Sequence, residues 1–226
     1  MRTDTDLMIK VERIVALLIA LSGGILFERC TVKSLDYGYG ENDAPTVEVG
    51  SQSWMTKNLN VDHFANGDPI PQAQSASEWE RASLEKRPAW CYYNSDPSSG
   101  NLYGKLYNWY CVNDPRGLAP SGWHVPSDAE WTKLTDYLGG EAVAGTKMKA
   151  MTMWENNGHG DNSSRLAGLP GGFRYSDGSF EGIGQVGTWW SSSSEASNRT
   201  LYFNRPRVVR YTYPMSSGFS VRCVRN

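Results

Sequence analysis

From Glu155 to Glu195 the chain is rich in glycine, asparagine and serine and has neither a helical nor a strand period. Unstructured loops of this length are uncommon inside a compact domain, so we expect the stretch to be ordered by its aromatic side chains or to carry function. The 226-residue chain holds nine tryptophans, twelve tyrosines and 23 glycines. This combination favours a loop-rich domain with short strands over a helical bundle.

The segment "GWHVPSDAEWTKL" predicts the start of a helix. Ser127 and Glu130 have the spacing of a capping box, and Asp128 lies in the first turn, where a carboxylate suits the helix dipole. The apolar face of this helix consists of Trp131, Leu134 and Leu138. We expect the helix to end at Gly139 and Gly140. Because these acids have structural roles, we expect His124 to be a half-buried packing residue.

Other segments predict short elements around this helix. "PTVEVGSQSWMTKNLNV" alternates about Gly50–Ser51 and predicts a hairpin, and Ser77 with Glu80 predicts a second capped helix ending before Pro88. "GTWWSSS", "TLYFN" and "GFSVRCV" predict three strands near the end of the sequence. Strands at both ends with helices between them predict an α+β domain whose terminal strands pair.

The first 30 residues are typical of an export segment. Met8 is a candidate start, and Lys10 and Arg13 precede an apolar run of about 14 residues, which suits a signal sequence better than a membrane span. Cys30 stands where a bacterial lipoprotein carries its lipid, although "FERC" lacks the usual small residues. Cleavage by ordinary signal peptidase and an uncleaved anchor are the alternatives. We assign 1–30 to export, 31–44 to a tether and 45–226 to the domain.

Three cysteines follow the export segment, an odd number for an oxidising compartment. The simplest expectation is that Cys91, Cys111 and Cys223 form one disulfide and leave one free thiol. A bond between Cys91 and Cys223 would close most of the domain, a constraint worth about 4–5 kcal/mol in the chain-entropy model. The sequence has no C-x-x-C motif or Cys/His cluster, so we expect no zinc site.

Seven blocks in order resemble the Fibrobacter succinogenes major paralogous domain: "GSQSWMTKNLNV", "AWCYYNSDP", "YGKLYNWYCV", "GWHVPSDAEWTKL", "LAGLPGGFRYSDGSF", "GTWWSSSSE" and "GFSVRCV". This resemblance covers about residues 45–226. It implies an exported, often lipid-anchored protein of the outer membrane or cell surface, with a periplasmic or secreted protein as the alternative. Members more often have a small residue at the position of Cys111, which implies a Cys91–Cys223 disulfide and a free Cys111.

The pattern is also similar to the C-type-lectin-like and formylglycine-generating-enzyme folds. This looser resemblance implies short antiparallel strands, two main helices and a long irregular loop region that carries function. Formylglycine-generating enzymes use a cysteine pair near the C-terminus. Here Cys223 alone stands there, so we expect a binding or structural module and keep an enzyme of this fold as a further alternative.

The net charge and the aromatic residues indicate which class of ligand to expect. A net charge of −2 gives no reason to expect nucleic acid, and membrane contact is expected only through the N-terminal anchor. Glycan is the leading ligand, because flat aromatic faces and polar side chains together bind sugars. We expect the site among Trp154, Trp189, Trp190, Asn157 and Asp161, with one of the adjacent tryptophans facing inward. Oxygens of the same loop could hold Ca²⁺. A protein–protein adhesion module is the alternative.

Overall fold

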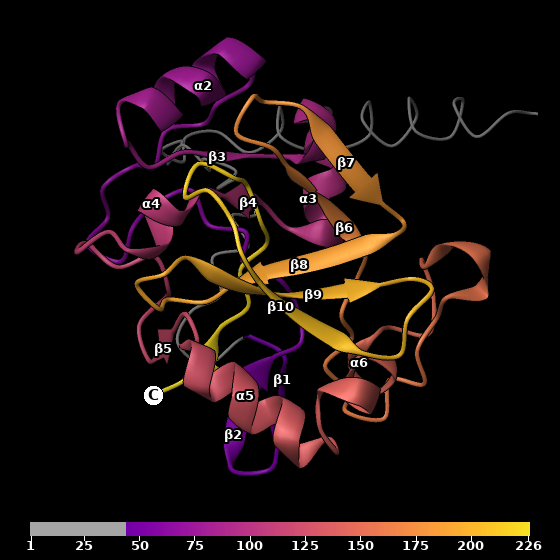
Figure 1. Cartoon of the computed structure of the whole chain (residues 1–226). Coiled ribbons are helices and arrows are strands. Elements are labelled where there is room, and N and C mark those ends of the chain that lie inside the picture. The colour runs from indigo at the N-terminus through magenta and orange to yellow at the C-terminus, as the bar shows by residue number, and fades with distance from the viewer. Residues whose placement is uncertain (1–43) are drawn as a thin grey trace, which may run out of the picture. The chain divides into compact units, whose positions relative to one another are not determined.

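The computed structural model describes residues 44–226, which combine short helices with mainly antiparallel sheets in an α+β arrangement (Figure 1). The export segment, the tether apart from Ala44, and the proposed lipid-bearing Cys30 lie outside the described residues. None of the described helices is long and apolar enough to cross a bilayer. The helices are α2 (Ala76–Leu84), α3 (Pro97–Tyr103), α4 (Trp109–Val112), α5 (Asp128–Tyr137) and α6 (Glu141–Met148), with 3₁₀ turns η1 (Tyr93–Ser95) and η2 (Glu155–Asn157).

The strands form three sheets. The four-stranded sheet has the order β1 (Thr46–Val49), β2 (Gln52–Met55), β11 (Val224–Arg225), β5 (Trp123–His124). The five-stranded sheet has the order β10 (Val208–Thr212), β9 (Ser197–Tyr202), β8 (Val186–Trp190), β6 (Gly171–Arg174), β7 (Phe180–Ile183). A small ladder joins β3 (Trp90–Cys91) to β4 (Leu106–Tyr107). The pairing of β6 with β8 is parallel, and the other strand pairs are antiparallel.

The predicted pairing of the terminal strands is confirmed. Val224 of β11 lies opposite Trp54 of β2 on one side and opposite His124 of β5 on the other. The predicted hairpin is also present, with Val49 opposite Gln52 across a turn in which Gly50 has a φ of +63°. This positive φ suits glycine, which has no Cβ to clash.

Both predicted helices exist, but only one begins at the expected residue. Ser127 accepts from the backbone N–H of Glu130, and the Glu130 carboxylate accepts from Ser127, which is the predicted box. In α2 the box is instead Ser75 with Glu78, so the prediction of Ser77 with Glu80 was wrong by two residues. The earlier register buries Trp79 and Ala82 together on one face of the helix.

The region expected to be one long irregular loop contains three strands from Gly171 onward, so that expectation was wrong in part. β6, β7 and β8 lie within it, and all four residues of β6 are buried. A strand that is covered on both faces has no alternation of polar and apolar residues, which is why the sequence shows no strand period here. Figure 1 shows β8 near the middle of the described part, with β6 and β7 beyond it.

Asn58, a buried amide, joins distant parts of the domain. Its Nδ2 donates to the carbonyl of Tyr103 (2.8 Å) and to Ser220 Oγ (3.2 Å). Its Oδ1 accepts from Trp189 Nε1 (2.8 Å) and from the Nη2 of buried Arg222 (2.7 Å). Burial lowers the pKa of Arg222 to about 9, so this guanidinium depends on its hydrogen bonds in the core.

A second polar link holds α5 against the five-stranded sheet. Asp128 Oδ1 accepts from Arg199 Nη1 (2.5 Å) and from Arg210 Nε (2.8 Å), and Arg210 also pairs with Glu195. Burial acts to raise the pKa of Asp128, but the hydrogen bonds from Arg199 and Arg210 outweigh it and the pKa is lowered. The Asp128 carboxylate therefore joins α5 to both β9 and β10.

The expected disulfide between Cys91 and Cys223 is absent. Cys91, Cys111 and Cys223 are free, buried thiols. Cys91 packs with Trp79 in the cluster beneath α2, whereas Cys111 and Cys223 belong to another core cluster. Cys111 Sγ donates to the carbonyl of Ala89 (3.3 Å). The pairing was wrong because Cys91, on the small ladder, and Cys223, directly before β11, pack in different core clusters.

Candidate functional site

The three tryptophans proposed as sugar platforms are core residues. Trp154 and Trp189 are 2% exposed and Trp190 is fully buried. Each indole N–H is used internally, on the carbonyl of Gly168, the Asn58 amide and the carbonyl of Tyr107, respectively. None of the three rings offers an open face to a ligand, so the expectation that they stack on a sugar was wrong.

The adjacent tryptophans do point to opposite faces of β8, as predicted. Trp189 packs in one core cluster and Trp190 in another. Both are buried because side chains cover the sheet on each face at this point. Alternation along the strand was therefore predictable, but the covering of the second face was not.

The polar loop residues of the expected site, Asn157 and Asp161, are exposed, whereas the tryptophans are buried. Asn157 ends η2 with a φ of +58° and lines an open cavity beside the buried ammonium of Lys149. Asp161 Oδ1 accepts from the backbone N–H of Ser163 (2.8 Å), and this hydrogen bond lowers the pKa of Asp161. Asp161 thus stabilises a turn.

A buried lysine fixes this loop. Lys149 Nζ donates to the carbonyls of Gly158 (2.8 Å), Tyr202 (3.2 Å), Arg205 (3.2 Å) and Phe203 (3.3 Å). Burial lowers the pKa of Lys149. Within residues 44–226 no group of three or more His, Cys, Asp or Glu side chains is arranged to hold a metal ion. The cavity near Asn157 is therefore bordered by a lysine already bound by carbonyl groups.

A cavity bordered by several half-buried aromatic rings lies on the five-stranded sheet. We call it the tyrosine groove; its volume is about 160 Å³. Buried Phe173 and Phe219 form its floor, and the half-buried rings of Tyr175, Tyr202 and Tyr213 border it. Phe219 also contacts Trp190 at a tilt of 43°, with ring centroids 4.3 Å apart, so the groove is the outer edge of the aromatic core.

The strands place polar groups at the same groove. Thr188 of β8 lies opposite Thr200 of β9, and their hydroxyl oxygens are 3.2 Å apart. Tyr175 donates its hydroxyl to Glu181 Oε2 on β7 (2.6 Å), and this hydrogen bond raises the pKa of Tyr175 to about 12. Burial raises the pKa of Tyr213. The groove thus combines neutral phenols with one exposed carboxylate.

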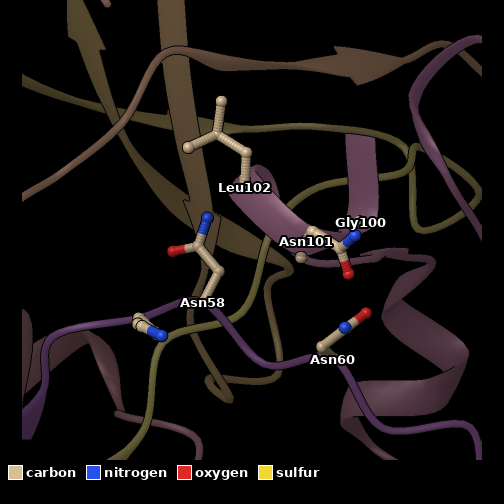
Figure 2. Close-up of a pocket in the computed structure, with 7 residues that line it drawn as sticks. Asn58, Asn60, Gly100, Asn101 and Leu102 are labelled. Carbon is tan, nitrogen blue, oxygen red and sulfur yellow. The ribbon is translucent and has the colours of Figure 1, made fainter. Parts of the chain in front are cut away.

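A second cavity, the asparagine pocket, lies between the segment after β2 and α3 (Figure 2). Its volume is about 370 Å³, and it is lined by Lys57, Asn58, Asn60, Gly100, Asn101, Leu102 and Gly104. Gly104 has a φ of +74°, and a Cβ there would lie 2.7 Å from the carbonyl oxygen of Leu59. Only glycine allows the two segments to approach this closely, so this residue shapes one wall.

Sequence reasoning missed both cavities. The tyrosine groove draws side chains from five separate segments, and its one local signal was the alternation "YTY" at Tyr211 and Tyr213, which continues β10. The asparagine pocket had the local signal "KNLN", which holds Lys57, Asn58 and Asn60. Nothing in the sequence showed that α3 lies across from it.

Of three comparisons with known proteins, one found a match. No curated protein and no solved structure matches it. Residues 47–225 match the Fibrobacter succinogenes major domain, which spans nearly all of the described residues. The chain therefore belongs to the Fibrobacter succinogenes major domain family.

Proposed function

We propose that this protein is an exported, surface-anchored binding module and that its ligand is a glycan held in the tyrosine groove. The observation that carries the proposal is the set of half-buried tyrosines beside the exposed Glu181 carboxylate. A sugar ring has apolar C–H faces that stack on aromatic rings and hydroxyls that donate to carboxylates.

The framework of the groove supports selective binding. Phe173 and Tyr202 stand on paired strands, and Tyr175 and Tyr213 directly follow β6 and β10. Tyr213 also contacts Phe219, with ring centroids 5.3 Å apart. Side chains held in this way lose little freedom when a ligand binds. A volume of about 160 Å³ is smaller than the roughly 300–1,000 Å³ of sites for drug-sized ligands, so the groove suits the end of a glycan chain.

Binding is favoured over thiol chemistry of the formylglycine-generating type. Burial raises the pKa of the Cys91 thiol to about 11 and that of Cys223 to about 12. Reactive cysteines are instead accessible and have a lowered pKa. We also infer a C-type-lectin-like version of the α+β fold, because β2 and β11 pair the two ends of the domain. Superposition of an experimental structure on such folds is the test.

Screening of the purified chain on a glycan array, followed by calorimetric titration of the best binder, tests the groove. Tyr213→Ala should weaken binding roughly tenfold or more, as expected for an aromatic residue at the centre of a contact. Tyr137→Ala is the matched control, since Tyr137 is 67% exposed on α5. Equal affinity of both variants, or binding only to proteins, would remove the glycan proposal in favour of an adhesion module.

The export and anchoring part of the proposal rests on the sequence of residues 1–30. Fatty-acid labelling of cells that express the chain addresses it directly. A lipid on Cys30 predicts a labelled protein in the membrane fraction and loss of the label in Cys30→Ser. An unlabelled protein in the medium or periplasm would indicate ordinary cleavage.

A further inference from the structure

The asparagine pocket takes no part in the proposed glycan site and is the larger of the two cavities, at about 370 Å³ against about 160 Å³. It falls within the usual volume range of small-molecule sites. Its wall is mainly polar, with three asparagines and a lysine, and its apolar side chain is Leu102, which is 46% exposed. The question is which ligand these groups would recognise.

Two of the asparagines differ in what their amides do. Asn58 makes hydrogen bonds through both its nitrogen and its oxygen within the core. The Oδ1 of Asn60 is enclosed yet has no partner among the described residues. Its Nδ2 makes no hydrogen bond to the described part of the protein and is not enclosed, so the amide of Asn60 turns its donors outward.

The asparagine pocket carries a positive charge, which, like the amide donors, favours a negatively charged ligand. Lys57 is exposed and forms no salt bridge with a carboxylate in residues 44–226. None of the seven lining residues is acidic. Exposed Asn101 stands on α3 across from Asn60, as Figure 2 shows, and adds a second amide. An ammonium and amide donors around one cavity complement a carboxylate.

We propose that the asparagine pocket binds the carboxylate of a sugar acid. In this arrangement Lys57 and the Asn60 Nδ2 donate to the carboxylate, and the amide of Asn101 contacts the neighbouring hydroxyls. The polar walls suit a hydroxylated acid better than an apolar one. The ligand is a free sugar acid or the uronic-acid end of a polysaccharide, which share this chemistry.

Titration of the full chain with galacturonate, followed by NMR chemical-shift changes, is the test. Galactose is the matched neutral control. Tighter binding of tetragalacturonate than of galacturonate would indicate the end of a polysaccharide rather than a free acid. Galacturonate should bind at least roughly tenfold more tightly than galactose, because the latter lacks the charge-assisted hydrogen bonds. Raised salt should weaken the binding of galacturonate.

Two variants tie the binding to named groups. Lys57→Gln should weaken galacturonate binding roughly tenfold and remove its dependence on salt, whereas Lys133→Gln, at an exposed lysine on α5, should leave both unchanged. Asn60→Leu should also weaken binding, yet leave the folded state as stable or more stable, because it removes an unpartnered buried oxygen. That combination separates a ligand-binding amide from a structural one.

Several results would overturn the proposal. Equal affinity for galactose and galacturonate would show that the carboxylate is not recognised, and so would unchanged binding in Lys57→Gln. Ligand-induced shifts confined to the tyrosine groove, or no binding of either sugar, would show that the pocket is not the site. The effect of Lys57→Gln and the shifts at the asparagine pocket do not depend on whether the tyrosine groove binds a glycan.

Discussion

At the scale of single residues, the three thiols show how much the chemistry of a side chain depends on where it packs. Cys91 and Cys223 have raised pKa values because burial disfavours their thiolates. Burial also raises the pKa of Cys111. Since the thiolate is the reactive form, all three should be inert while the domain is folded.

This inertness can be measured by alkylation without reductant and mass spectrometry. We expect no alkylation of Cys91, Cys111 or Cys223 in the native protein and complete alkylation of all three in urea. Prior reduction is the control and should change nothing. A cross-linked peptide that joins any two of these cysteines would contradict the free thiols.

The failed disulfide prediction has a physical explanation. An odd number of cysteines left the choice of partner to family resemblance, and sequence separation says nothing about which core cluster a side chain enters. Cys91 enters the cluster around Trp79, and Cys223 enters the cluster around Tyr107. That outcome depends on tertiary packing, which no local pattern encodes.

At the scale of elements, local rules succeeded where hydrogen bonds are local. The Ser127–Glu130 box and the turn at Gly50 involve residues within a few positions of one another, and both were predictable. In "SASEWE" two overlapping boxes satisfy the same rule. The burial of Trp79, which is tertiary, favours the box that starts at Ser75.

The two candidate caps of α2 can be separated by substitution. Ser75→Ala should destabilise the protein by about 1 kcal/mol because it removes the N-cap hydrogen bond to Glu78. Ser77→Ala should change stability by less than about 0.5 kcal/mol, as for most exposed positions. Urea unfolding gives both values, and hydrogen exchange at the first amides of α2 detects local fraying. A larger loss in Ser77→Ala would favour the other register.

Sequence reasoning missed β6 and β10 for different reasons. β6 is buried along its length and therefore shows no alternation of polar and apolar residues. β10 has exposed positions, but its sequence was not recognised as a separate strand after β9. The tyrosine groove depends on both strands. The tyrosine groove was therefore missed because the strands that build it were missed.

At the scale of the whole molecule, the Asp128 link makes stability depend on pH. The pKa of Asp128 is lower in the folded state than in an unfolded chain, where it is about 3.9. The folded state therefore gains stability from Asp128 above pH 4, and this gain is lost as the pH falls through the lowered pKa.

Asp128→Asn should reduce this acid dependence. At pH 7 the variant should be less stable by about 2 kcal/mol, below the usual cost of breaking a fully buried pair, because Asp128 is partly exposed and an amide still accepts. Below pH 4 the two stability curves should converge. Asp136→Asn, exposed on the same helix, controls for the loss of one negative charge. Parallel urea-unfolding curves from pH 7 to pH 3 would contradict this role.

The central place of β11 has a consequence for how the chain reaches its native state. β1 and β2 are synthesised first and can pair at once, but the inner edge of β2 has no partner until Val224 arrives. An open strand edge invites pairing with another molecule. The nascent chain therefore runs its greatest risk of misassembly while it still lacks its final strand. A chaperone that delays collapse until synthesis or translocation is complete would protect this fold.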